Sequence, residues 1–206
     1  FIKHHEGSSN LKFVNADLLD KEVLNKEMEG IDFVFHMAAN PDIQYGIEHT
    51  DHDLKQNTIA TYNVLETMRL NNVKKIGFAS TSAVIGEAKT IPTPEDYAPL
   101  QPLSLYGASK LACEGLITAY CHTFGFQSWI FRFANIIGER GITHMALIDF
   151  IKKLRKDPTK LEILGDGQQS KPLLLVNELI EAMFYIVENS DERINVYNCA
   201  GPDRIK

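Results

Sequence analysis

Two apolar stretches, Asp32-Phe33-Val34-Phe35-His36 and Lys75-Ile76-Gly77-Phe78-Ala79, stand on either side of a long helical pattern and decide the fold class. Each is a short apolar run bounded by polar residues, which is typical of a buried strand. Between them, residues 53–70 repeat apolar side chains at helical spacing. Two buried strands joined by a helix run parallel, and helices must cover both faces of their sheet.

The alternation of strands and helices continues outward from this unit. Before it we expect a strand over Leu11–Val14 and a helix over Lys21–Met28. After it, a loop over residues 87–103 holds four of the eight prolines. The later elements are a helix at 105–124, a strand at 128–133, a helix at 145–155, a strand at 161–164 and a helix at 177–188. This order predicts an α/β fold with a doubly wound, Rossmann-like parallel sheet and a small, partly represented substrate lobe.

Composition excludes several classes of partner. The chain of 206 residues carries 21 basic and 27 acidic side chains, a net charge of −6, which argues against nucleic acid or an anionic membrane as its partner. It has no apolar run of membrane-spanning length, and residues 1–10 do not form a signal peptide, so we expect a cytoplasmic protein. Cys113, Cys121 and Cys199 lack metal-binding spacing and are interpreted as reduced, structural thiols.

The first candidate for chemistry is the pair Tyr106 and Lys110, four residues apart on one face of a helix. A nearby ammonium lowers the pKa of a phenol, which makes the tyrosine an acid or base for proton transfer at a hydroxyl. The spacing alone fits a surface lysine beside a packed tyrosine equally well. Thr81, at the end of a predicted strand, offers a second hydrogen bond, although Ser80 or Ser82 would serve the same purpose.

Three further features of the sequence each have a functional and an ordinary structural interpretation. Ala38-Ala39 would let a flat cofactor approach the backbone, or would simply allow tight packing of a strand against a helix. The segment His49–Asp53 contains side chains that bind metals, but two histidines just before a helix are typical of a solvated cap, so we expect no metal. His36 ends a buried strand and is interpreted as a hydrogen-bonded core histidine.

Six ordered motifs resemble those of the extended short-chain dehydrogenases/reductases, the NAD-dependent epimerase/dehydratase family. They are Phe35–Ala39 (family H-x-A-A), Gln56–Glu66 (N-x-x-G-T-x-N-V-L-E), Ser80–Gly86 (S-S/T-x-x-V-Y-G), Tyr106–Lys110 (Y-x-x-S-K), Arg132–Gly138 (R-Y-x-N-x-Y-G) and Gly165–Gln169. Together they are far more specific than any one of them. Around residues 38–42 the chain is most similar to archaeal-type UDP-glucose 4-epimerases.

The resemblance implies NAD as cofactor and a nucleotide sugar as substrate. It assigns catalysis to Thr81, Tyr106 and Lys110, with the latter two also on the nicotinamide ribose. The cofactor residues it implies are Asp17 and Leu18 at the adenine, then Ala38, Ala39, Asn57, Ser80 and Phe133. It implies that Thr81 also holds the sugar, while Asn135 and Lys171, which replaces a family arginine, contact the substrate diphosphate.

The activity implied is interconversion of UDP-glucose and UDP-galactose through a 4-keto intermediate, with transient hydride transfer to bound NAD. Sugar dehydratases of the family carry an Asp-Glu pair after the threonine, where this chain has Ser82 and Ala83. That departure disfavours dehydration. The alternatives are an NAD(P)-dependent sugar reductase or dehydrogenase of the same family, and a dinucleotide-binding protein without catalysis.

Three further expectations follow from the resemblance. Residues 1–138 form a dinucleotide-binding domain lacking its first βαβ unit, and residues 139–206 contribute to the substrate lobe and the last sheet strands. The glycine-rich pyrophosphate turn of the family is absent from this sequence, so we expect roughly 45 residues before Phe1 and several tens after Lys206. The nearly uncharged helix at 105–124 needs cover on a second side, and a homodimer through it and the helix at 53–70 would supply that cover.

Overall fold

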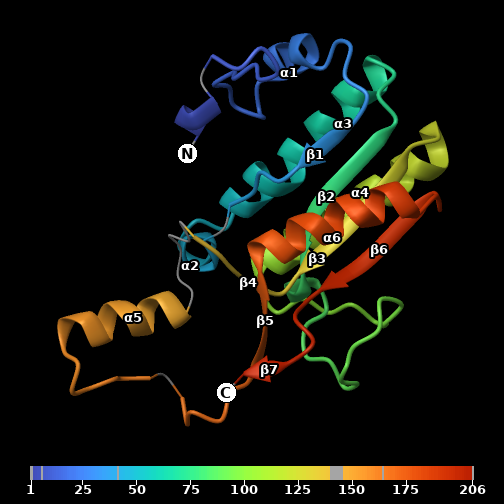
Figure 1. Cartoon of the computed structure of the whole chain (residues 1–206). Coiled ribbons are helices and arrows are strands. Elements are labelled where there is room, and N and C mark those ends of the chain that lie inside the picture. The colour runs from blue at the N-terminus through green and yellow to red at the C-terminus, as the bar shows by residue number, and fades with distance from the viewer. Residues whose placement is uncertain (1, 6, 41, 140–145, 164, 206) are drawn as a thin grey trace.

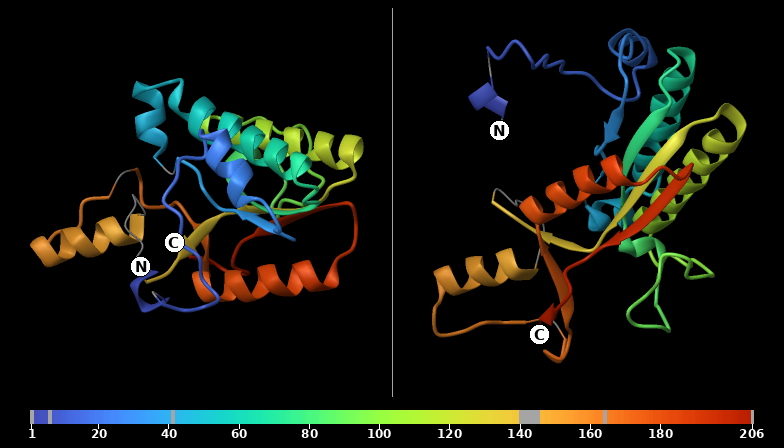
Figure 2. Two further views of the ribbon diagram at one scale, coloured as in Figure 1. Left: turned by 90° about the horizontal axis from the view of Figure 1, so that it is seen from above. Right: turned by 45° about the vertical axis from the view of Figure 1, so that its right-hand side comes forward.

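The main sheet is parallel and has four strands. The computed structural model describes residues 2–5, 7–40, 42–139, 146–163 and 165–205. Within them, β1 (Val34–His36), β2 (Lys75–Thr81), β3 (Gln127–Phe133) and β6 (Ile194–Cys199) pair in the order β1-β2-β3-β6. Helices lie on both faces of this sheet (Figure 2, left). The doubly wound, Rossmann-like α/β class expected from the sequence is therefore confirmed.

The helices that cover the first face lie side by side (Figure 1). They are α1 (Lys21–Glu27), α3 (Ala60–Leu70) and α4 (Leu105–Phe124). A π-helix, Leu54–Ile59, leads directly into α3, so the helix expected over 53–70 begins with wider turns. The side chain of Ser104 caps the start of α4 by accepting the Gly107 N–H, and Gly125, at φ 69°, ends it.

The opposite face of the sheet is covered by α6 (Val176–Asn189) (Figure 2). The hydrophobic core therefore consists of two clusters, one on each face. Successive side chains of a strand point to opposite faces. Ile130 of β3 therefore packs with the α3 and α4 cluster around Phe78, while Trp129 and Phe131 pack with Leu179 of α6. Burial on both sides explains why the middle of β3, Trp129–Phe131, is a continuous apolar run.

A second, smaller sheet lies beyond the main one. It pairs β4 (Asn135–Ile137) in parallel with β5 (Lys171–Leu175), and β5 antiparallel with β7 (Arg204–Ile205). The remaining elements are α2 (Ile43–Glu48), α5 (Ala146–Lys156) and short 3₁₀ helices at Ile2–His5 and Ser82–Val84. No helix in the described part of the chain combines the length and apolarity needed to cross a membrane. The predicted division of the chain after residue 138 stays a prediction.

Two expected strands are wrong. Residues 11–14 run without strand pairing, with Phe13 67% exposed, because no described strand lies beside them to accept their backbone hydrogen bonds. Residues 161–163 are likewise unpaired, and the strand of this region is β5, ten residues later. Pro41, Met145 and Leu164, which belong to the predicted motif, helix and strand, lie outside the described residues.

Candidate active site

The parallel strands bring the residues that follow them to one edge of the sheet. His36 ends β1 and leads into Ala38 and Ala39, and Thr81 at the end of β2 is in register with Phe133 at the end of β3. In open α/β sheets, ligands bind outside the carboxyl ends of the strands. This edge is therefore the candidate site.

Thr81 and Tyr106 meet at this edge, as the sequence predicts. Thr81 comes from β2 and Tyr106 from the first turn of α4, and the Thr81 hydroxyl is near enough to the phenol to oppose the rise of its pKa. The Thr81 hydroxyl also accepts the Ala83 N–H at 3.2 Å, which fixes its rotamer at the start of the short 3₁₀ helix. A substrate hydroxyl placed here would meet two side-chain hydroxyl groups at once.

Lys110 lies one helical turn beyond Tyr106 and is 2% exposed. Its Nζ donates to the carbonyl of Ala79 at 2.6 Å and lies 4.5 Å from the centre of the Phe78 ring. Burial lowers the pKa of Lys110 to about 8, although Cys113 and Glu114 oppose the shift. A large fraction of the ammonium form is thus retained at neutral pH, in a position that faces the strand ends.

The pKa of Tyr106 departs from the sequence expectation. Burial raises it, the charges of Asp53 and Cys113 raise it further, and the hydrogen bond with Thr81 opposes them. The expected lowering by Lys110 is not found, because the ammonium is bonded to the Ala79 carbonyl and loses its proton near pH 8, below the range in which this phenol ionises. In this state Tyr106 is a proton donor.

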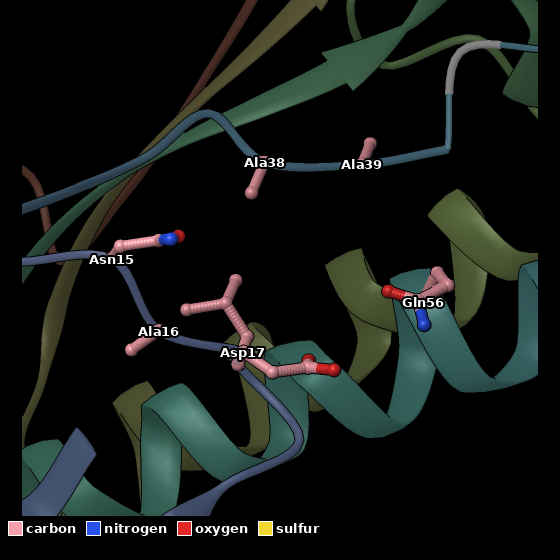
Figure 3. Close-up of a pocket in the computed structure, with 7 residues that line it drawn as sticks. Asn15, Ala16, Asp17, Ala38, Ala39 and Gln56 are labelled. Atoms are coloured by element: carbon pink, nitrogen blue, oxygen red, sulfur yellow. The ribbon is translucent and has the colours of Figure 1, made fainter. Parts of the chain in front are cut away.

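Beside the first strand end lies a hollow of about 410 Å³, a size that suits a small ligand. It is lined by Asn15, Ala16, Asp17, Leu18, Ala38, Ala39 and Gln56. Figure 3 shows Ala38 and Ala39 on one side, with Asp17 and Gln56 across from them. The structure thus gathers four of the predicted cofactor residues around one hollow.

Hydrogen bonds hold the wall of this hollow in place. Oδ1 of Asp17 accepts the Leu19 N–H at 2.9 Å, which closes a local turn. The buried amide of Asn63 on α3 donates to the Leu18 carbonyl at 3.0 Å. The loop that lines the hollow is therefore anchored to a helix of the core.

Three other predicted cofactor residues do not line this hollow. Asn57 is 1% exposed inside the π-helix, and Ser80 is buried, with its hydroxyl donating to Glu114 Oε1 at 2.5 Å. Phe133 is half-buried and packs against the cluster around Trp129. Their role in binding a cofactor stays a prediction.

The two predicted diphosphate contacts lie on neighbouring strands of the small sheet. Asn135 begins β4 and donates its amide to the Pro172 carbonyl at 3.2 Å, and Lys171 begins β5. Lys171 is exposed. The structure places an amide and an ammonium next to each other on the lobe, and their contact with a substrate stays a prediction.

A buried ion pair below the site was missed from the sequence. Glu114 of α4 accepts two hydrogen bonds from Arg132 of β3, at 3.1 and 2.8 Å, and both residues are nearly fully buried. The third guanidinium nitrogen of Arg132, Nη1, donates to the Glu95 carbonyl of the proline-rich loop. A signal was present, since Glu114 is one of only two charged residues in an otherwise uncharged helix and lies four residues after Lys110.

The structure confirms the interpretation of His36 as a hydrogen-bonded core histidine. His36 is 4% exposed, and its Nε2 lies 2.9 Å from the Thr61 hydroxyl. Burial, and then Lys110, lowers its pKa to about 4, so it is a neutral core residue. The described residues contain no cluster of three or more metal-binding side chains.

The chain belongs to the NAD-dependent epimerase/dehydratase family, whose sequence model matches residues 2–200. A Methanocaldococcus jannaschii protein with the provisional name UDP-glucose 4-epimerase is 34% identical over 191 residues, covering 90% of this chain and 62% of that protein. A UDP-glucuronate 4-epimerase of Thermodesulfobacterium geofontis is 30% identical over 174 residues, covering 84% and 53%. Several sugar nucleotides are thus represented among the relatives.

Solved structures agree with this family. The crystal structure of a UDP-galactose 4-epimerase superposes with a TM-score of 0.80 at 35% identity, covering 98% of this chain and 68% of the other. The UDP-glucuronic acid 4-epimerase of Bacillus cereus, solved with NAD, superposes with a TM-score of 0.88 at 30% identity, covering 98% and 64%. The chain therefore spans roughly two thirds or less of the length of its relatives.

Proposed function

We propose that this chain carries the catalytic part of a nucleotide-sugar 4-epimerase that uses NAD and interconverts UDP-glucose and UDP-galactose. The observation that carries the proposal is that Thr81 at the end of β2 and Tyr106 in the first turn of α4 meet at the carboxyl edge of the sheet, one helical turn from the buried ammonium of Lys110. These are the groups that hold a sugar hydroxyl and move its proton.

The residues around the hollow fit a dinucleotide. Ala38 and Ala39 present small side chains at its wall, so a planar group can approach the backbone there. Within the described part of the chain, Lys110 Nζ makes one hydrogen bond, to the Ala79 carbonyl. An ammonium has three N–H donors, so two are left for ribose hydroxyls. When bound, NAD supplies the hydride acceptor for the sugar carbon.

The role of each side chain follows from its position. Thr81 holds the sugar 4-hydroxyl, and Tyr106 exchanges a proton with the same oxygen. The ammonium of Lys110 orients the ribose, and it lies one helical turn from the phenol that exchanges the proton. Asn135 and Lys171 contact the diphosphate from the neighbouring lobe.

Two features favour epimerisation over the alternatives. Ser82 and Ala83 occupy the start of the 3₁₀ helix after Thr81, so no carboxyl group follows the threonine to eliminate water. The relatives include 4-epimerases for more than one sugar. A net reductase or dehydrogenase would need the same tyrosine and lysine but would consume or release reduced cofactor.

The test is conversion of UDP-galactose by the full-length protein and two tyrosine variants. We expect Tyr106→Phe to lose at least about a hundredfold in turnover, the size of a missing acid–base catalyst. Tyr120→Phe is the matched control, since Tyr120 lies on the same helix with its hydroxyl bonded to Glu66. Equal turnover in the parent and Tyr106→Phe would refute the proposal. Conversion of UDP-glucuronate but not UDP-galactose would refute the proposed substrate.

We also propose that the intact protein is a homodimer packed through α3 and α4. Large apolar side chains of the π-helix, α3 and α4 are exposed on this side, namely Leu54, Ile59, Tyr62, Leu70, Leu105 and Phe124. A second copy would remove this surface from water. Light scattering at micromolar concentration should give the mass of a dimer, and Ala112→Arg on the exposed side of α4 should give a monomer. Ala182→Arg, equally exposed on α6, is the control. A parent protein that is monomeric would contradict the dimer.

A further inference from the structure

A buried carboxyl group lies behind the candidate site and has no part in the chemistry above. Asp53 precedes the π-helix and is 2% exposed. Its Oδ1 accepts the side-chain amide of Asn40 at 2.9 Å and that of Asn57 at 3.3 Å. Carboxyl groups are rarely buried unless both oxygens accept hydrogen bonds. The two amides satisfy one of the two oxygens of Asp53, Oδ1.

The amides bonded to Asp53 connect two segments of the site. Oδ1 of Asn57 accepts the backbone N–H of Asn40 at 2.8 Å, directly after Ala38 and Ala39. The amide of Asn57 also donates to the Ser109 hydroxyl at 2.9 Å, which in turn donates to the Tyr106 carbonyl at 2.8 Å. A single chain of hydrogen bonds therefore joins the wall of the hollow to the turn that carries Tyr106.

The second oxygen of Asp53 is the unusual one. Oδ2 is buried without a hydrogen-bond partner among the described residues. It faces Gly46 of α2, where an added Cβ would lie 2.2 Å from it, so only glycine leaves room for the carboxyl group. An unpaired buried oxygen is costly, and the close fit against Gly46 shows that the fold holds it in one position.

We propose that Asp53 is a positioning residue of the active site, whose carboxyl group fixes the Ala39–Asn40 segment and the first turn of α4 relative to each other. The proposal rests on the proposed function only in the importance it gives to Tyr106. The arrangement of Asp53, Asn40 and Asn57 exists without cofactor or substrate.

The charge of Asp53 acts on Tyr106 in a defined direction. It raises the pKa of the phenol, as Cys113 does, so removing it should lower that pKa. The titratable side chains on the nearby turns of the surrounding elements include Lys110, Cys113 and Glu114 of α4, His36 of β1, Asp42, Tyr45 and Glu48 at α2, His49, Asp51 and His52 before the π-helix, and Lys55 within it. Of these only Asp51 changes, in the control variant, so a difference between Asp53→Asn and Asp51→Asn reports Asp53.

The experiment follows the ionisation of Tyr106 in the cofactor-free protein by NMR of tyrosine labelled with carbon-13 at Cζ. The Tyr106→Phe variant assigns the resonance. We expect Asp53→Asn, which keeps an acceptor oxygen for Asn40 and Asn57, to move the Tyr106 midpoint to lower pH than in the parent. Asp51→Asn is the matched control, because Asp51 is exposed and paired with Lys55, and it should leave the midpoint in place. An unchanged midpoint in Asp53→Asn would overturn the proposal.

A second variant covers the case in which Asp53→Asn does not fold. Gly46→Ala keeps the charge but forces the carboxyl group to move, so the Tyr106 midpoint should differ from that of the parent. Gly115→Ala is its control, since an added Cβ there meets nothing within 4 Å. Equal midpoints in Gly46→Ala and the parent would overturn the proposal. Because no turnover is measured, a protein that lacks epimerase activity would still give a decisive result here.

Discussion

Removal of the Glu114 carboxylate should be the most damaging single change to the stability of the core. Glu114 and Arg132 are 6% and 5% exposed, and their pair is bidentate. Glu114→Ala leaves a buried guanidinium unpaired and also removes the acceptor of the Ser80 hydroxyl. Removing one partner of such a pair costs about 3–5 kcal/mol. At roughly 2–4 °C per kcal/mol for a chain of this size, Tm should fall by about 6–20 °C.

The measurement is urea unfolding followed by tryptophan fluorescence. Trp129 is the only tryptophan and lies on β3, three residues before Arg132, so it reports the strand directly. The double variant Glu114→Leu with Arg132→Met should recover most of the loss, because two apolar side chains need no partner. Asp149→Asn, which breaks a solvent-exposed pair with Lys153, should cost less than about 1 kcal/mol. A loss below about 1 kcal/mol in Glu114→Ala would refute the inferred burial of the pair.

Three further perturbations test other features of the structure. Burial in the folded state lowers the pKa of His36 from 6.5 to about 4. Between these two values the unfolded chain binds a proton that the folded chain does not, so the free energy of unfolding decreases as the pH is lowered. Between pH 7 and pH 4.5 in urea titrations, His36→Asn should lose roughly 2–3 kcal/mol less than the parent, and equal losses in both proteins would contradict this. The folded state lowers the pKa of Lys110 from 10.5 to about 8, which means that the buried ammonium destabilises the folded state at pH 7. Lys110→Met should therefore raise Tm at pH 7 while turnover is lost, and this gain in Tm should shrink between pH 8 and 10.5. A lower Tm at pH 7 would be the contrary result. Gly86→Ala should lower the free energy of unfolding more than Gly30→Ala does. Both glycines have φ near +75°, but only at Gly86 would an added Cβ clash with a backbone oxygen, that of Gln101. Equal urea midpoints for the two variants would contradict that contact.

The sequence predicted three of the four strands of the main sheet, β1, β2 and β3, because their signals are local, and it missed β6. Each of the three contains an apolar core, and α4 has a capping serine at one end and glycine at the other. The failed strands at 11–14 and 161–163 share a cause, since an apolar run becomes a strand only where a neighbouring strand accepts its hydrogen bonds. β4, β5 and β7 are only two to five residues long, so their weak alternation did not distinguish them from loops.

The candidate site was predictable where it depends on strand ends and helical spacing. Thr81, Tyr106 and Lys110 follow from those two rules, and Ala38 follows from the end of β1. Asp17 lines the hollow although the strand expected before it is absent, so its prediction depended on the family resemblance. Asp53 was out of reach, because its importance comes from Asn40 and Gly46, which only the folded chain brings against it. The pKa of Tyr106 also required the structure, since burial outweighs the nearby lysine that the spacing suggested.

The most direct test of the proposed activity uses UDP-galactose with deuterium at C4, incubated with the full-length protein in ordinary water. A 4-epimerase that returns the same hydride gives UDP-glucose with the deuterium still at C4 and no net change in reduced cofactor. We predict that product from the parent and from Tyr120→Phe, and none from Tyr106→Phe. UDP-glucose without deuterium, or accumulation of reduced cofactor, would contradict epimerisation by Tyr106 and Thr81.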